Sequence, residues 1–189
     1  MKRLVLKFGG TSVGTIEKIK KVANIIKKRQ SEGNQIIVIV SAMSGDTNEL
    51  EKKSNAISDN FDNQELDVLL SSGEQVSSSL LAGAIIELGI KARSWLGWQI
   101  PIITNKNHTA SQIIKIKTDE ILSFIKNGGV AVIAGFQGIS EESRITTLGR
   151  GGSDLSAVAI AKFFKTDSCE IYTDVEGVLT TDPSINEKA

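Results

Sequence analysis

The sequence has few cysteines, few aromatic residues and no net charge, and each shortage excludes a class of protein. Its one cysteine, Cys169, cannot form an internal disulfide, and we expect it to be a buried residue in a chain kept in a reducing cytoplasm. Lys and Arg together number 22, as do Asp and Glu. The chain therefore lacks the basic excess typical of nucleic-acid-binding proteins, and we expect no nucleic-acid partner. No apolar run is long enough to span a membrane, and the first residues do not form a signal peptide.

Aromatic residues make up only 5% of the chain, so its core must consist mostly of Ile, Val, Leu and Ala. Such cores are typical of parallel sheets covered by helices. Residues 4–8 read as a short strand and residues 35–40 as a fully buried strand, and residues 15–30 repeat apolar side chains at helical spacing. A strand, a helix and a strand in this order predict a βαβ unit with parallel strands.

The rest of the chain continues this alternation. We predict an extended segment at 91–103, a strand at 130–136, a glycine-rich region with a hairpin at 135–152 and a strand at 170–173. We predict helices at 49–70 (with a break near 58–60), 73–88, 118–126 and 154–165. The fold class is therefore α/β with a mainly parallel sheet, in which ligands bind beyond the carboxyl ends of the strands.

The first candidate motif is the string KFGGTSVG at residues 7–14. A lysine ends a strand, a glycine pair turns the chain, and a helix follows, which is an arrangement that suits phosphate. The spacing is not that of a P-loop. The alternative interpretation is an ordinary turn between a strand and a helix, with Lys7 facing solvent.

Two further polar segments have both a structural and a functional interpretation. Residues 41–48 follow a buried strand and either bind a polar ligand or cap the next helix. Residues 71–75 place Glu74 in the predicted first turn of a helix. Its carboxylate there either compensates the helix dipole or binds the ammonium group of a substrate.

The string TTLGRGGSD at residues 146–154 is the hardest to explain as structure alone. Three glycines let the backbone approach a ligand closely, and Arg150 can hold a carboxylate or a phosphate with two hydrogen bonds. The alternative is a glycine-rich turn whose Ser153 or Asp154 caps the next helix. Residues 171–183 fit either a nucleoside pocket or an ordinary loop. The lone histidine, His108, has no cysteine or second histidine nearby, so we predict a surface or loop residue rather than a zinc ligand.

Six strings together resemble the aspartate kinases of the amino acid kinase family. They are KFGGTSV at 7–13, VSAM at 40–43, SSGE at 71–74, GFQG at 135–138, TLGRGGSD at 147–154 and YTDVEGVLTTDP at 172–183. The resemblance implies an αβα sandwich with a mainly parallel central sheet. It also implies an amino-acid-substrate lobe at 1–154 and the beginning of an incomplete nucleotide-binding lobe at 155–189. Most family members also carry two ACT modules, but we expect no ACT regulatory domains in this sequence.

The implied activity is ATP-dependent phosphorylation of the side-chain carboxylate of L-aspartate to 4-phospho-L-aspartate. In the family this reaction opens the pathway to lysine, threonine and methionine. ATP and Mg²⁺ are the implied nucleotide and cation, and we expect a cytoplasmic homo-oligomer with no membrane partner.

The resemblance also assigns roles to individual residues, and it assigns no protein ligand to a metal. Lys7 and Asp154 would be catalytic. The aspartate-binding positions would be Ser41, Thr47, Glu74, Arg150 and Ser153. The ATP-binding positions would be Lys7, Phe8, Gly9, Gly10, Thr11, Ser12, Thr173, Asp174, Leu179 and Ser184. Many relatives carry Tyr and Arg at the last two of these positions.

Two alternatives to an aspartate kinase stay open. One is a related acid kinase of the same fold, acting on glutamate, acetylglutamate or a nucleotide. The other is a catalytically incompetent fragment that still binds aspartate. A dehydrogenase is disfavoured, because no GxGxxG string follows the first strand.

Overall fold

A five-stranded parallel sheet occupies the centre of the molecule. The structure is a computed structural model that describes residues 1–173. The sheet has the strand order β3-β6-β2-β1-β9, and every neighbouring pair is parallel. Its strands are β1 (Arg3–Phe8), β2 (Gln35–Val40), β3 (Ala92–Trp95), β6 (Val130–Ala134) and β9 (Ser168–Tyr172). The predicted mainly parallel sheet is therefore confirmed.

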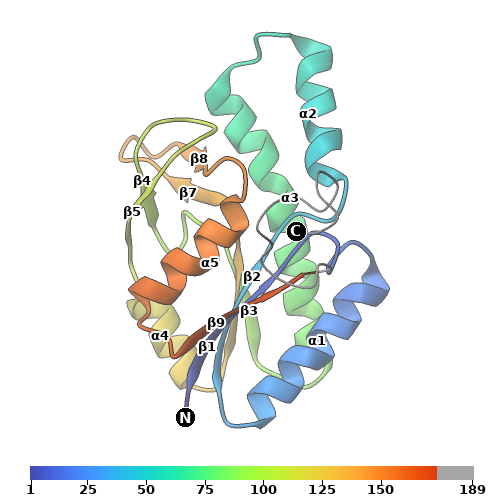
Figure 1. Cartoon of the computed structure of the whole chain (residues 1–189), viewed down its shortest axis with the longest axis vertical. Helices are drawn as coiled ribbons and strands as arrows, with labels where there is room; N and C mark the ends of the chain where they lie inside the picture. The colour runs from blue at the N-terminus through green and yellow to red at the C-terminus, as the bar shows by residue number, and fades with distance from the viewer. Residues whose placement is uncertain (174–189) are drawn as a thin grey trace, which may run out of the picture.

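Helices cover both faces of this sheet and complete the αβα sandwich (Figure 1). Helices α1 (Ile16–Ser31) and α3 (Asn63–Glu87) pack on one face, and α4 (Asp119–Lys126) and α5 (Gly152–Phe163) pack on the other. Helix α2 (Asp46–Ile57) packs against α3 and extends with it beyond the sheet. The predicted layer arrangement is confirmed.

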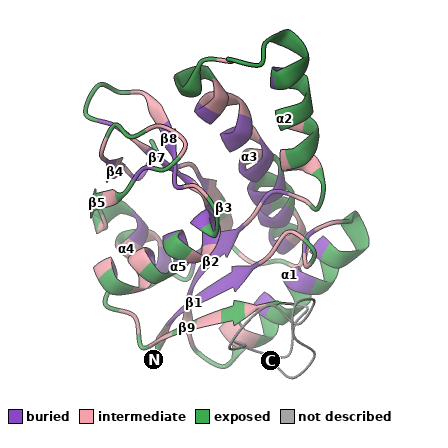
Figure 2. Ribbon diagram, turned by 45° about the horizontal axis from the view of Figure 1, so that its top comes forward, coloured by how far each residue is buried: buried purple, intermediate pink, exposed green. Residues whose placement is uncertain are grey.

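The alternation of side chains along each strand divides the core into two clusters. On β1, Leu4, Leu6 and Phe8 face the helices α1 and α3, whereas Val5 faces α4 and α5. Figure 2 shows the central strands as almost continuously buried between the two helical layers. The same alternation places Lys7 on the α5 side of the sheet, and this position sets up its contact in the site.

A second, smaller sheet was not expected from the sequence. It has the order β5-β4-β7-β8 and mixes parallel and antiparallel pairs. Its strands are β4 (Ile102–Thr104), β5 (Ile113–Ile116), β7 (Gln137–Ile139) and β8 (Ile145–Thr147). The hairpin predicted within 135–152 is confirmed as β7–β8. The sheet itself could not be predicted, because strands of three or four residues are too short to show a period.

Helix α3 corrects the prediction of separate helices at 49–70 and 73–88. The chain breaks at residues 58–62 and then forms one continuous helix of 25 residues. Glu74 therefore lies in the middle of a helix and not in a first turn. Gly73 therefore does not begin a helix. It lies within α3 and packs closely on the loop after β2, since a Cβ at this position would lie 2.7 Å from the Cβ of Ala42.

Three smaller expectations also need correction. Helix α2 begins at Asp46, so the loop after β2 ends at Gly45 and Thr47 is a helical residue. Helix α4 begins at Asp119, one residue later than predicted, because Thr118 occupies its N-cap position. Cys169 is exposed rather than buried, on a strand at the edge of the sheet within the described part of the chain.

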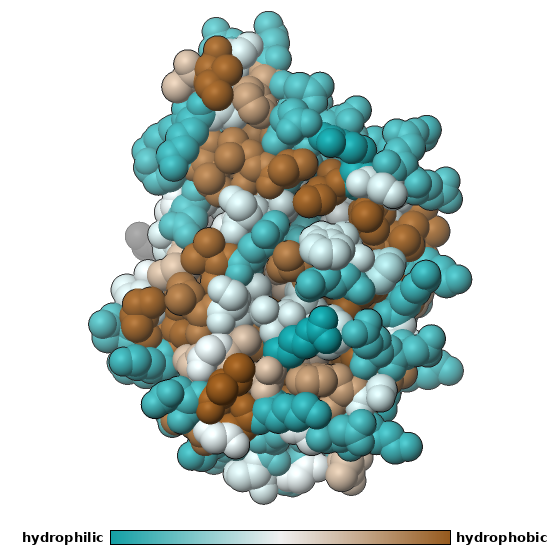
Figure 3. Space-filling view, turned by 180° about the vertical axis from the view of Figure 1, so that it is seen from behind, coloured by the Kyte–Doolittle hydropathy of each residue, from teal (hydrophilic) through white to brown (hydrophobic). Residues whose placement is uncertain are grey.

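On the rear face of the molecule, apolar patches alternate with charged side chains (Figure 3). The exposed apolar residues on α3 include Val76 and Leu80. Among residues 1–173, no helix is both long enough and apolar enough to cross a membrane.

The packing of Gly73 generates a stability prediction with an internal control. Gly73→Ala forces a methyl group against Ala42, so we expect it to lower the free energy of unfolding by about 1–3 kcal/mol. Gly83 lies on the same helix, and among the described residues no heavy atom outside the helix backbone lies within 4 Å of the position that a Cβ would take. Gly83→Ala should therefore raise the free energy of unfolding by about 0.5–1 kcal/mol. Urea denaturation of both variants measures the two effects, and equal stabilities would refute the packing role of Gly73.

Candidate active site

Three loops meet in one cleft beyond the carboxyl ends of the central strands. The ends coincide because the strands are in register, with Phe8 opposite both Val40 and Tyr172. The loops after β1 and β2 approach so closely that a Cβ on Gly10 would lie 2.8 Å from the carbonyl oxygen of Ala42. The third segment precedes α5. Together with α2 and α3 they enclose a cleft of about 540 Å³.

Eight of the predicted site residues line this cleft. They are Lys7, Gly10, Ser41, Thr47, Glu74, Arg150, Ser153 and Asp154. All five predicted aspartate-binding residues and both predicted catalytic residues are in this group. The structure thus brings together residues that are up to 147 positions apart, from Lys7 to Asp154.

Lys7 forms an ion pair across the floor of the cleft. Its Nζ lies 2.6 Å from Oδ1 of Asp154, in the first turn of α5. The lysine is buried, whereas the aspartate side chain is 48% exposed. The alternative of a solvent-facing lysine is therefore wrong. Lys7 is also close to the glycine turn, since its Nζ lies 3.6 Å from the position of a Cβ on Gly9.

Glu74 presents a buried carboxylate with one free oxygen. Its Oε1 accepts a hydrogen bond of 3.0 Å from the backbone N–H of Ala42. Its Oε2 is buried and has no hydrogen-bond partner among the described residues. Burial raises the pKa of the Glu74 carboxyl to about 7, and the negative charge of Asp46 adds to this rise, while backbone N–H groups oppose it. A buried carboxylate with a free oxygen is suited to a cationic ligand.

Arg150 offers the opposite charge. It is exposed and lies between Gly149 and Gly151, which have φ angles of 74° and 69°. These left-handed angles favour glycine, and they turn the backbone sharply on both sides of the arginine. Within residues 1–173 the guanidinium makes no hydrogen bond or ion pair. It is therefore free to bind an anionic ligand.

The predicted ATP-binding residues are divided between two places. Phe8, Thr11, Ser12 and Thr173 line a separate groove of about 430 Å³ between α1 and β9. The Phe8 ring stacks on Tyr172 with centroids 4.6 Å apart, and the Gly9 N–H donates to the Tyr172 carbonyl oxygen at 3.4 Å. Asp174, Leu179 and Ser184 lie outside the described residues. The assignment of these residues to ATP stays a prediction.

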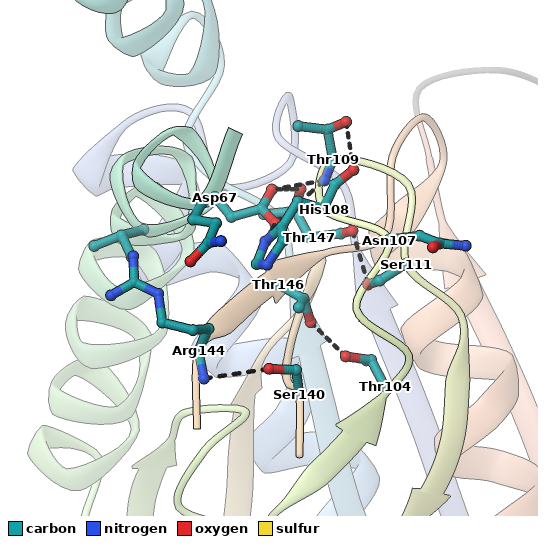
Figure 4. Close-up of polar contacts among 12 residues, drawn as sticks. Asp67, Thr104, Asn107, His108, Thr109, Ser111, Ser140, Arg144, Thr146 and Thr147 are labelled. Carbon is teal, nitrogen blue, oxygen red and sulfur yellow. Dashed lines mark hydrogen bonds and ion pairs between the residues drawn. The ribbon is translucent and has the colours of Figure 1, made fainter. Parts of the chain in front are cut away.

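Sequence reasoning missed a buried carboxylate beside the cleft. Asp67 on α3 is fully buried and accepts hydrogen bonds from His108, Thr109 and Thr147 (Figure 4). His108 does lie in a loop, as predicted, but its side chain is only 11% exposed. The spacing of the two acidic residues could have indicated Asp67. It lies seven residues before Glu74, which places both carboxylates on one face of a helix.

Metal ligands are scarce in this site. No group of three His, Cys, Asp or Glu side chains in the described part of the chain could hold a metal ion. Asp154 is the carboxylate that meets Lys7 in the cleft. One carboxylate is enough for a magnesium ion that receives its other ligands from phosphates and water.

The chain is similar to known proteins along its whole length. Residues 2–189 match the model of the amino acid kinase family. An aspartate kinase of Stutzerimonas stutzeri is 51% identical over 189 residues, which are the whole of this chain and 46% of that protein. An aspartokinase of Rickettsia conorii is 50% identical over 188 residues, 98% of this chain and 47% of that protein. The chain thus spans about half the length of the curated relatives that it matches.

Solved structures show the same fold. The aspartate kinase of Synechocystis superposes with a TM-score of 0.82 at 47% identity, over 98% of this chain and 30% of that one. Aspartokinase III of E. coli, solved with aspartate and ADP, superposes with a TM-score of 0.85 at 24% identity, over 97% of this chain and 52% of that one. The match of the family model to nearly every residue, on a fold shared with these enzymes, leads to one conclusion: the chain belongs to the amino acid kinase family.

Proposed function

We propose that this chain transfers the γ-phosphoryl group of ATP to the side-chain carboxylate of L-aspartate, giving 4-phospho-L-aspartate. The observation that carries the proposal is that one cleft contains the buried Oε2 of Glu74 and the guanidinium of Arg150, neither of which has a partner among residues 1–173. An α-amino acid carries an ammonium and a carboxylate on one carbon, and these side chains offer one partner for each. Relatives at 50–51% identity are named aspartate kinase or aspartokinase, which supports the choice of aspartate.

The reaction requires positioning and positive charge rather than a general base. The side-chain carboxylate of free aspartate has a pKa of about 4, so it is ionised at neutral pH. One of its oxygens attacks the γ-phosphorus, the bond from phosphorus to the bridging oxygen breaks, and ADP leaves with the electron pair. The obstacle is repulsion between two anions. Lys7 at the floor of the cleft supplies a cation for the phosphoryl oxygens, and Asp154 holds the lysine in place.

Hydroxyl groups would make further hydrogen bonds to the amino acid. Ser41, Thr47 and Ser153 line the same cleft and can donate to either carboxylate of the substrate. The turn at Gly9 and Gly10 would meet the phosphates with backbone N–H groups. We assign Phe8, Thr11, Ser12 and Thr173 to the ATP side of the site, together with Asp174, Leu179 and Ser184.

Magnesium is proposed as part of the nucleotide complex. The phosphates would supply most of its ligands, and Asp154 is the residue of the cleft that would contact it. When bound, the ion neutralises charge on the phosphates. The protein's own contribution is the placement of Lys7 and Asp154 on facing elements, β1 and α5.

We extend the proposal to the organisation and setting of the protein. Residues 1–154 would form the amino-acid lobe, and residues 155–189 would begin the nucleotide-binding lobe. The reaction would serve the biosynthesis of lysine, threonine and methionine in the cytoplasm. The protein would act as a homo-oligomer.

A hydroxylamine-trapping assay on the purified chain tests the activity. Incubation with ATP, Mg²⁺ and L-aspartate should yield an acyl phosphate that hydroxylamine traps as a coloured hydroxamate. L-glutamate is the control substrate. Hydroxamate with aspartate alone would support the proposal, and preference for glutamate would favour a related acid kinase. No hydroxamate from a chain that binds aspartate in calorimetry would mean a binding module without turnover.

Lys7→Ala should lower the maximal rate by about a hundredfold or more, because a cation at the transferring group is lost. Its affinity for aspartate, measured by calorimetry, should change by no more than a few-fold. Lys20→Ala, on the exposed side of α1, is the matched control and should leave both quantities unchanged. A Lys7→Ala rate within twofold of the parent would exclude a role for this lysine in phosphoryl transfer.

The raised pKa of Glu74 predicts how aspartate affinity depends on pH. An ammonium ligand pairs with the ionised carboxylate, and a pKa of about 7 keeps this carboxyl largely protonated at pH 6. The ionised fraction, and with it the affinity, should rise about tenfold from pH 6 to pH 8. Glu74→Gln should bind more weakly and lose this dependence, while Glu87→Gln at the exposed end of α3 should behave as the parent. Superimposable pH profiles of Glu74→Gln and the parent would disprove the pairing.

A further inference from the structure

Asp67 is a buried carboxylate that the proposed chemistry does not use. It lies on α3 with none of its surface exposed, and both of its oxygens are occupied. Oδ1 accepts from Thr147 Oγ1 at 2.5 Å and from the Thr109 N–H at 3.0 Å. Oδ2 lies 2.7 Å from His108 Nδ1 and 3.2 Å from the Thr109 nitrogen. Because a carboxylate only accepts, Nδ1 of His108 carries the proton of this contact.

These bonds join three segments that are distant in sequence. Asp67 belongs to α3, His108 and Thr109 to the loop between β4 and β5, and Thr147 to the end of β8. Figure 4 shows the side chains of the loop and of β8 converging on the aspartate. Burying a carboxylate is costly unless its oxygens are bonded, so the contacts hold the three segments together strongly.

The partners of Asp67 reach the cleft, although Asp67 itself does not line it. Thr109 and Thr147 both belong to the cleft wall, close to Arg150. The network therefore connects the interior of the molecule to the surface that would hold the substrate.

A short path leads from this network to Arg150. The carbonyl oxygen of Thr147 accepts from both the N–H and the hydroxyl of Ser111, at 2.9 Å and 2.8 Å. The next turn rests on the same loop, because a Cβ on Gly149 would lie 3.1 Å from the carbonyl oxygen of Thr109. Arg150 follows directly and has no partner of its own within residues 1–173. The backbone before Arg150 therefore packs against residues that are hydrogen-bonded to Asp67.

We propose that Asp67 is a positioning residue for substrate recognition: through Thr147 and Thr109 it holds the Arg150 turn where the guanidinium can bind the α-carboxylate of the amino acid. The inference rests on the proposed function. Loss of the anchor should weaken binding in the ground state and the transition state alike. It should therefore raise the KM for aspartate and leave kcat nearly unchanged.

Thr147→Val tests the anchor, because it replaces the hydroxyl by a methyl group of similar size. We expect the dissociation constant for L-aspartate, measured by calorimetry on the 189-residue chain, to rise about ten- to a hundredfold. Thr147→Ser keeps the hydroxyl and loses the methyl group, and its affinity should stay within about threefold of the parent. If the methyl group rather than the hydroxyl were needed, Thr147→Ser would bind weakly as well. His108→Ala removes the hydrogen bond from the loop between β4 and β5 to Oδ2 of Asp67, and it should also weaken aspartate binding. It keeps the test decisive if Thr147→Val does not fold in a thermal melt.

A double-mutant cycle shows whether the effect passes through Arg150. Arg150→Lys keeps the charge but loses the two-pronged geometry. In that background Thr147→Val should change aspartate affinity by less than about twofold, because the oriented group is already lost. Full additivity of the two changes would overturn the positioning role.

The outcomes separate this inference from the proposed function. A parent chain that binds aspartate, together with a Thr147→Val variant that binds it equally well, overturns the inference and leaves the function intact. A parent chain that binds no aspartate overturns both. Weakened binding that Thr147→Ser restores and Arg150→Lys masks supports both.

Discussion

The close contact between α3 and the loop after β2 is the constraint on which the rest of the site depends. It exists because position 73 carries no side chain, which lets the helix lie directly on Ala42. At this distance the next residue, Glu74, accepts a hydrogen bond from the N–H of Ala42, and its second oxygen has no partner among the described residues. The same helix carries Asp67 two turns earlier, where it anchors the opposite wall. One helix thus sets the spacing between the two sides of the site.

The charged side chains of the cleft differ in whether they have a partner of opposite charge. Lys7 and Asp154 form an ion pair with each other. In the part of the chain that the structure describes, Oε2 of Glu74 and the guanidinium of Arg150 have no such partner. Burial raises the pKa of Glu74 to about 7, which records the cost of leaving its charge unpaired. A zwitterion relieves this cost at one end and neutralises Arg150 at the other, and we therefore favour an amino acid as the ligand.

The sequence predicted the central sheet and most of the cleft, because both depend on local patterns. Runs of β-branched residues indicated β2, and the helical period indicated α1, in agreement with the structure. Glycine next to charged or hydroxyl residues indicated the strand-end loops, and Lys7, Glu74 and Arg150 were all singled out. The prediction failed where a residue serves packing between distant segments. Gly73 looked like a helix boundary, although it lies within one continuous helix.

The sequence alone determined most strands and helices of the central sandwich and the chemical groups that follow its strands, because a period of side chains and a glycine turn are encoded within a few neighbouring residues. Tertiary structure decided which of these groups meet. The ion pair of Lys7 with Asp154, the hydrogen bond from Ala42 to Glu74 and the hydrogen bonds of Asp67 join residues between 32 and 147 positions apart. No local pattern specifies such contacts, since they arise only when parallel strands align in register and the helices close over them.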